Sequence, residues 1–142
     1  MSWIFLAVLT AIFYGAYNVF IKIGAGHINQ IVGAVILQVV AALLGGVILL
    51  ILKLTNSPLE ISAKGVRFAV LAGIMVGLAE ITSFFVFSKG VSASTGIPII
   101  IGGSVVVGAV VGVFFLKEAL APLHYLAIAF IVLGVVLLLT SK

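Results

Sequence analysis

Five long apolar runs, separated by short polar segments, dominate the sequence and limit what the chain can fold into. A helix of about 20 mostly apolar residues crosses a bilayer core about 30 Å thick, and each run is long enough. Helices are expected because backbone polar groups must pair internally in lipid. The runs are Trp3 to Ile23, Ile31 to Leu52, Val66 to Ser88, Thr95 to Leu116 and Pro122 to Thr140. The sequence therefore predicts an all-α integral membrane fold, with five transmembrane helices bundled in a single domain over residues 1–142.

The composition excludes a soluble domain. Hydrophobic residues make up 65% of the chain and charged residues 7%, with a mean hydropathy of +1.54, whereas soluble domains carry about 25% charged residues. The net charge of +4 comes from basic residues dispersed near the span ends. That pattern indicates anchoring in the lipid bilayer rather than a nucleic-acid surface. The absence of cysteine excludes disulfides, thiolate metal sites and thiol catalysis.

Two local signals refine the ends of the spans. The first run could be a secretory signal peptide, but no basic segment precedes it and four more runs follow, so we expect a span. In the longest connection, Ser57, Pro58 and Glu60 match a capping box with proline at the first helical position. We therefore expect one or two interfacial helical turns there, and a cap at Ser92 or Ser94 for the fourth helix.

Glu80 is the one charged residue deep inside an apolar run, more than a dozen residues from the start of the third span. The other charged residues lie at or near the ends of runs, where water or lipid headgroups solvate them. A buried carboxylate costs several kcal/mol unless it is paired, protonated or hydrated. Acids within membranes usually mark a substrate, ion or proton pathway, which makes Glu80 the leading functional residue.

Counting along the helices places other polar residues at the depth of Glu80. Asn18, Gln38 and Glu80 each lie eight or nine residues from the turns that end at one membrane surface, roughly 12 to 14 Å below it. In the fourth helix this depth falls near Gly102, Gly103 and Ser104, just beyond Pro98, a residue that can kink a helix. The sequence thus predicts a polar layer near the midplane.

Helical spacing places these residues on shared faces. In the third span one stripe holds Gly73, Gly77, Glu80, Phe84 and Phe87, so the acid lies on the small-residue side where helices approach closely. In the first span Tyr14, Asn18 and Lys22 are four residues apart, with Tyr17 beside them. We therefore expect a polar cavity lined by Tyr14, Tyr17, Asn18, Gln38, Glu80 and Ser104, with Lys22 at its mouth.

Structural roles are the alternatives. Asn18 and Gln38 could only hydrogen-bond between helices. The two tyrosines could be interface aromatics, and Lys22 could extend to the headgroups. Glu80 could form a structural ion pair with Lys22.

No motif for catalysis, metal or cofactor binding is present. The glycine-rich segment with Gly108 and Gly112 lacks the Gly-Lys-Ser/Thr of a phosphate loop, and this pair predicts a close helix contact instead. There is no Ser-His-Asp, HExxH or paired-carboxylate set, so an enzyme is not expected. His27 and His124 fall in turns on opposite sides of the membrane, which disfavours a shared metal site.

The basic residues give little bias in orientation. Lys53, Lys64, Arg67 and Lys117 fall on one side of the predicted bundle, and Lys22, Lys89 and Lys142 on the other. Four against three slightly favours a cytoplasmic N-terminus. A chain so balanced could insert both ways and pair with an inverted copy of itself.

Two stretches resemble the EamA-like domain of the drug/metabolite transporter superfamily. "AIFYGAYNVFIKIGAG", with Asn18 and Lys22, is similar to the opening of that domain. The run from Ser88 to Leu139 is similar to its ending: a small-residue turn, a helix with proline, an acid at the helix end (Glu118) and a last helix with glycine (Gly134). The resemblance covers nearly the whole chain.

The resemblance implies a half-length transporter. Family members commonly have ten spans made of two inverted five-span repeats, with the site between the halves, so a five-span chain would work as an antiparallel homodimer in a prokaryotic inner membrane. The four-span small multidrug exporters of the superfamily carry a membrane-embedded Glu on the first helix. Here the first helix offers Asn18 and the acid lies on the third, which departs from their cation and proton exchange.

The expected function is secondary transport of small metabolites or drug-like solutes by alternating access, without a cofactor. Glu80 would bind a proton or a cationic solute group, while Asn18, Gln38 and the tyrosines would hydrogen-bond the solute. The alternatives are a non-transporting scaffold or assembly subunit, whose polar residues pair in a dry interior, and a cation/proton antiporter of the small-multidrug-resistance type. A heterodimer with another half-length protein is also open.

Overall fold

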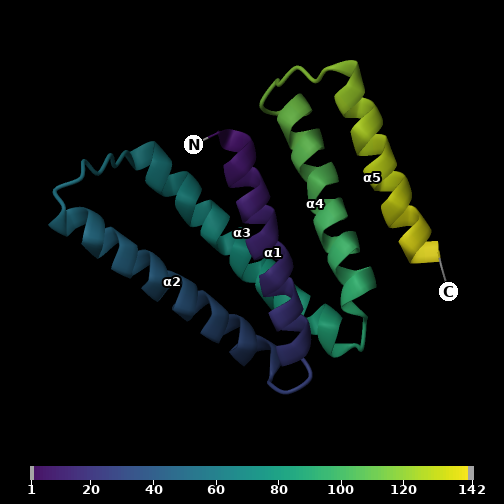
Figure 1. Ribbon diagram of the computed structural model, residues 1–142, viewed down its shortest axis with the longest axis horizontal. Coiled ribbons are helices and arrows are strands. Elements are labelled where there is room, and N and C mark those ends of the chain that lie inside the picture. Colours follow the sequence, from purple (N-terminus) through teal and green to yellow (C-terminus); the bar gives the residue numbers. More distant parts are fainter. Residues whose placement is uncertain (1, 141–142) are drawn as a thin grey trace. The chain divides into compact units, whose positions relative to one another are not determined.

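The computed structural model describes residues 2–140 and consists of five α-helices over that range (Figure 1). The helices are α1 (Trp3–Gly24), α2 (Gln30–Leu54), α3 (Ala63–Ser88), α4 (Ala93–Phe114) and α5 (Pro122–Thr140). Each is long and apolar enough to cross a membrane, and no strand occurs between residues 2 and 140. The predicted all-α membrane fold with five spans is confirmed.

Side-chain caps fix where two of the helices begin. Asn29 Oδ1 accepts hydrogen bonds from the backbone N–H groups of Ile31 (3.0 Å) and Val32 (3.3 Å), so α2 begins directly after a turn of a few residues. Ser62 Oγ accepts from the N–H of Gly65 at 3.0 Å and caps α3. In α4 the cap position is Ser92, whose hydroxyl donates to Thr95 Oγ1 instead of accepting from the backbone.

The predicted interfacial turns after Ser57 are wrong, because residues 57–62 form no helix. The hydroxyl of Ser57 lies 3.1 Å from Thr55 Oγ1, and its N–H donates to the carbonyl of Leu52, so Ser57 completes the end of α2 instead of starting a new helix. Asn56 between them has a left-handed φ of 52°. An isolated helical turn is costly to nucleate, and the chain stays irregular until Ser62 caps α3.

Contacts divide the chain into two compact units, each described by itself. Residues 19–90 form the α2–α3 unit, which also holds the end of α1. The α4–α5 unit comprises the chain up to Asn18 and from Val91 onward. Figure 1 shows each pair of helices as an antiparallel hairpin. The organisation of residues 1–142 as one domain stays a prediction.

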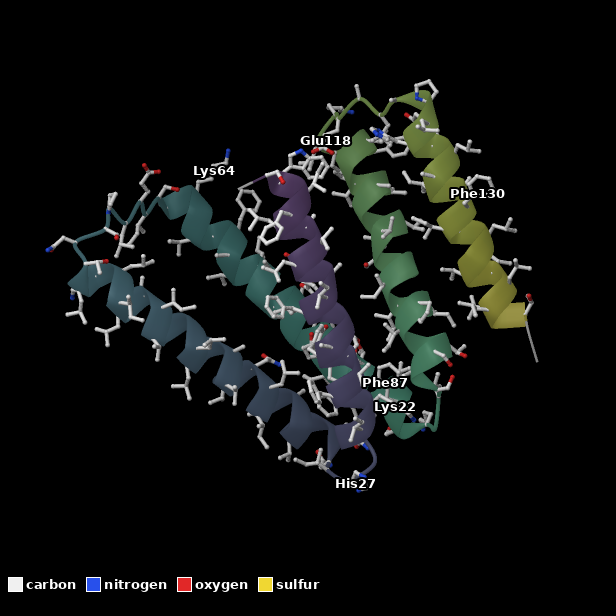
Figure 2. The ribbon with its side chains drawn as sticks, in the orientation of Figure 1. Lys22, His27, Lys64, Phe87, Glu118 and Phe130 are labelled. Atoms are coloured by element: carbon white, nitrogen blue, oxygen red, sulfur yellow. The ribbon has the colours of Figure 1, made fainter. Side chains whose placement is uncertain are left out.

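The core of the α2–α3 unit lies at one end of its hairpin, next to the turn between α1 and α2. Lys64 and Phe87 lie at opposite ends of α3, and the core is at the Phe87 end (Figure 2). The buried side chains of the unit are Ile21, Ala25, Ala34, Glu80, Ser83, Phe84 and Phe87. Two of the seven are polar. Glu80 thus belongs to the packed interior and not to a lipid-facing surface.

Gly102 allows close packing in the α4–α5 unit. A Cβ added to Gly102 would lie 2.5 Å from Cγ2 of Val135 on α5. Beside this contact runs an open apolar groove of about 540 Å³, bordered by Pro98 and Gly102 on one helix and by Ile131 and Gly134 on the other. The side chains of α5 are otherwise exposed along its length, as expected for a helix that faces lipid or another subunit.

Candidate functional site

Glu80 lies within the apolar helix α3, and its side chain is only 3% exposed. It shares one face of that helix with Phe84 and Phe87, four and seven residues further on, and both rings are buried. Gly77 continues the face one turn before it. Burial of this carboxylate disfavours its charged form unless a proton, a cation or hydrogen-bond donors accompany it. The face is therefore chemically suited to bind a proton or a positively charged group.

Two contacts set the register between α2 and α3. The ring of Phe84 packs on Gly33, where a Cβ would approach its Cε1 atom to 2.5 Å. Seven residues earlier in α3, the amide of Gln38 covers Gly77, with Oε1 3.3 Å from the position of a Cβ. Glu80 lies between these two levels, about 4.5 Å along the helix from Gly77. Gln38 is therefore about one turn deeper than Glu80, whereas counting from the turns placed both residues in one layer.

Ser83 belongs to the same buried face and was not among the sequence-predicted residues. It is 7% exposed and follows Glu80 by three residues, a spacing that makes side chains neighbours on a helix. The signal was available in the sequence, since the stripe through Glu80 and Phe87 passes beside position 83.

Asn18, in the α4–α5 unit, is 1% exposed and uses half of its amide within α1. Its Nδ2 donates to the carbonyl of Tyr14 at 2.8 Å. A carbonyl accepts only, so this bond identifies which end of the amide carries the nitrogen. The other end, Oδ1, is buried without a hydrogen-bond partner among residues 2–140. Asn18 thus offers a buried hydrogen-bond acceptor that a solute N–H or O–H could use.

The two predicted tyrosines contact each other. The rings of Tyr14 and Tyr17 have centroids 5.3 Å apart and meet edge to face at 68°. Tyr14 is 49% exposed and Tyr17 is half-buried. Lys22, one turn beyond Asn18, is half-buried and forms no ion pair with any residue that the structure describes.

The predicted residues of α4 and the remaining glycines lie in varied surroundings. Ser104 is exposed, and its hydroxyl donates to the carbonyl of Ile101 at 2.7 Å. Pro98 lies inside α4, at the apolar groove. A Cβ at Gly112 would meet Oε2 of Glu118 at 2.7 Å, a side chain that Figure 2 shows at the α4–α5 connection. A Cβ on the other three glycines would meet no described atom within 4 Å: Gly73, Gly103 and Gly108. The close helix contact predicted for Gly108 and Gly112, within the chain or between protomers, stays a prediction.

Residues 2–140 contain no group of three or more His, Cys, Asp or Glu side chains placed to hold a metal ion. His27 is exposed in the turn before α2 (Figure 2). Within the α2–α3 unit, the polar groups on the facing sides of the two helices are the carboxylate of Glu80, the amide of Gln38 and the hydroxyl of Ser83.

Comparisons with known proteins find a family and a relative that this chain resembles. The model of the EamA-like transporter family matches residues 1–140. A protein of Sinorhizobium sp. named "Uncharacterized transporter in cobO 3'region" is 31% identical over 137 residues, an alignment that covers 96% of each chain. No solved structure matches this chain significantly.

Proposed function

Because the chain belongs to the EamA-like transporter family, we propose that it is a secondary transporter of small metabolites or drug-like solutes that works by alternating access. It is an integral, multi-pass membrane transporter with five helices that can span the bilayer. The solute would bind on the buried face of α3 around Glu80. The family points to transport, which is not an enzymatic activity.

The burial of Glu80 carries this proposal. A carboxylate at 3% exposure inside an apolar helix is costly to maintain, and a purely apolar side chain would pack there at lower cost. Binding a proton or a cationic group would offset the cost of burying the carboxylate in one part of a transport cycle. Release of that proton or group would bring the cost back. Such a difference between two states is what couples a conformational change to a ligand. Gln38 on α2 and, on the sequence evidence, Asn18, Tyr14 and Tyr17 would hydrogen-bond the solute, and Ser104 would line the cavity.

We further propose an antiparallel homodimer in the inner membrane of a prokaryote as the working unit. Two lines support it: the near balance of basic residues between the predicted sides, and the ten-span, inverted-repeat plan that the family resemblance implies. Reporter fusions to the C-terminus should show both orientations for a homodimer. A single orientation, with a second half-length protein co-purifying, would instead indicate a heterodimer.

Solvent access to the Glu80 face separates a transporter from a scaffold. The chain has no cysteine, so a single cysteine can be introduced without background. Ser83→Cys should react with a membrane-impermeant methanethiosulfonate reagent, because an alternating-access site opens to water. Val39→Cys, on an exposed apolar stretch of α2, is the lipid-facing control and should stay unlabelled. If Ser83→Cys reacts no faster than Val39→Cys from either side, the interior is dry and the scaffold reading holds.

A cation/proton antiporter of the small-multidrug-resistance type is the second candidate. The acid on α3 rather than α1 separates this chain from that pattern. The observation in its favour is that Glu80 is the one buried acid among residues 2–140. Export of quaternary ammonium dyes that disappears in Glu80→Gln would favour this candidate.

A further inference from the structure

The two ends of the Asn18 amide in α1 are used differently. Nδ2 donates to the backbone carbonyl of Tyr14 at 2.8 Å, which fixes the orientation of the amide. Oδ1 is buried and has no hydrogen-bond partner among residues 2–140, and the whole side chain is 1% exposed. Turning the amide over would lose the bond to Tyr14 and set Oδ1 against a carbonyl oxygen. The buried end of Asn18 is therefore an acceptor only.

The described chain offers no donor to this oxygen. Backbone N–H groups inside a helix are already bonded to carbonyls four residues earlier, so α1 has none to spare at this depth. Ile21, three residues after Asn18, is buried and apolar. Lys22, one turn after Asn18, forms no hydrogen bond with any residue from 2 to 140. Buried polar atoms are nearly always hydrogen-bonded, so Oδ1 calls for a donor from outside the chain.

The chemistry of an amide oxygen limits what this donor can be. An amide is uncharged, and a cation buried beside it alone would keep most of its desolvation cost. A neutral N–H or O–H group needs only one acceptor, which Oδ1 supplies. A carbonyl or ether oxygen of a solute would meet Oδ1 without a proton between the two atoms. Asn18 therefore suits a neutral donor and disfavours an acceptor.

We propose that Asn18 determines solute specificity by accepting, at Oδ1, a hydrogen bond from an uncharged N–H or O–H group of the solute. The inference rests on the proposed function and narrows its solute class to molecules that carry such a donor besides any group bound by Glu80. An analogue that lacks only this donor leaves a buried acceptor unpaired. Sites that hydrogen-bond a polar group of their substrate discriminate against such analogues for this reason.

The test uses two pairs of tritiated probes, each pair with the same ring and the same ammonium group. Tryptamine and 1-methyltryptamine differ in one ring N–H, and tyramine and 4-methoxyphenethylamine differ in one O–H. The dissociation constant of each probe is measured with the purified full-length protein. The comparison within a pair needs no variant, so it does not depend on whether a substitution affects folding.

Three variants then assign the preference to one atom. Asn18→Leu keeps a similar volume and removes the acceptor. Asn18→Thr keeps an acceptor oxygen, and its hydroxyl can donate to the carbonyl of Tyr14, as Thr10 and Thr140 do to carbonyls four residues earlier. Thr10→Val is the matched control, because it removes an exposed hydroxyl of α1 that is already bonded to the carbonyl of Leu6.

We expect wild type to bind the donor-bearing member of at least one pair about ten-fold more tightly, the usual effect of one hydrogen bond to a buried acceptor. Asn18→Leu should weaken that member to the level of its methylated partner, whose binding should not change. Asn18→Thr should restore part of the preference, and Thr10→Val should behave as wild type. A wild type without a preference in either pair, or an Asn18→Leu variant that keeps it, overturns the inference.

Glu80→Gln separates this inference from the proposed function. Weaker binding of both members of a pair, with their ratio unchanged, supports both roles. Weaker binding in Glu80→Gln, with no preference in wild type, supports Glu80 as the solute site and overturns the role of Asn18. Undiminished binding by Glu80→Gln contradicts the role of Glu80, while a preference that Asn18→Leu abolishes still supports Asn18.

Discussion

The ring of Phe84 occupies the space that a side chain on Gly33 would need, with its Cε1 atom 2.5 Å from the position of a Cβ. This contact holds α2 against α3 one turn from Glu80, so the buried acid depends on a glycine in the neighbouring helix. Ala34 beside it and Phe87 on the facing helix are buried in the same core. The position of Glu80 is therefore set by a small-to-large fit rather than by polar contacts alone.

Gly33→Ala should destabilise the protein by about 1–3 kcal/mol, because its methyl group must displace a packed ring. Thermal unfolding in detergent, followed by tryptophan fluorescence, measures the effect. Gly45→Ala, in the same helix with no described atom within 4 Å of the added methyl, is the control and should be neutral or slightly stabilising. Equal melting temperatures for the two variants would rule out this contact.

Gly102→Ala and the adjacent Gly103→Ala should behave differently in the α4–α5 unit. A methyl on Gly102 would meet Val135 Cγ2 at 2.5 Å, whereas a methyl on Gly103 would meet no described atom within 4 Å. We expect Gly102→Ala to lower the melting temperature and Gly103→Ala to preserve it, since alanine favours a helix over glycine by about 1 kcal/mol. The reverse order would mean that Gly103, not Gly102, packs against α5.

Gly77→Ala should reduce function more than stability. The added methyl would lie 3.3 Å from Gln38 Oε1, and a flexible amide can move by a few tenths of an ångström at little cost. Moving that amide should weaken solute binding several-fold if Gln38 contacts the solute. Gly73→Ala, one turn earlier on the same face and without a neighbour, is the control. Identical affinities in both variants would remove Gln38 from the site.

Asn18→Leu should keep or raise thermal stability while uptake of solute falls. The buried Oδ1 acceptor has no partner among residues 2–140, and an unsatisfied buried acceptor costs about 1–3 kcal/mol. Leucine of similar volume removes that cost. A residue that destabilises the protein yet supports uptake is typical of a binding site. If Asn18→Leu instead unfolds the protein, its hydrogen bond to Tyr14 is the main role of the side chain.

Lys117→Gly should raise the melting temperature slightly. Lys117 adopts a left-handed φ of 59° in the α4–α5 connection, a conformation that costs about 1 kcal/mol or more for a residue with a Cβ and little for glycine. Lys89→Gly is the matched control, because Lys89 ends α3 with an ordinary φ of −75°. Glycine there only adds unfolded-state entropy, so its melting temperature should fall.

The spans could be predicted from sequence because their signal is length and hydropathy, properties that a bilayer selects directly. The burial of Glu80 was also predictable, since spacing alone places it on one face with Phe84 and Phe87. The irregular segment before α3 was not, because Ser57 and Ser62 are equally good caps by residue type, and interfacial turns were predicted after Ser57. Only the hydrogen bond of Ser57 to Thr55 decides between them.

The positions of individual side chains within the site could not be predicted from the sequence. Counting residues from the turns put Gln38 level with Glu80, whereas the packing of Phe84 on Gly33 sets the register and leaves Gln38 deeper. Thr82 and Ser83 are neighbours of similar type, yet Thr82 is exposed and bonds to the backbone of α3, whereas Ser83 is buried.

Uptake into proteoliposomes by wild type and Glu80→Gln tests the central claim most directly. The panel should contain labelled benzylamine, alanine, glucose and citrate, each measured with and without an imposed pH gradient. Glu118→Gln is the matched control, because it makes the same change at an exposed carboxylate outside the helices. We predict uptake of at least one solute by wild type and Glu118→Gln, and a loss of about ten-fold or more in Glu80→Gln. Equal uptake of every transported solute by Glu80→Gln and wild type would contradict the account.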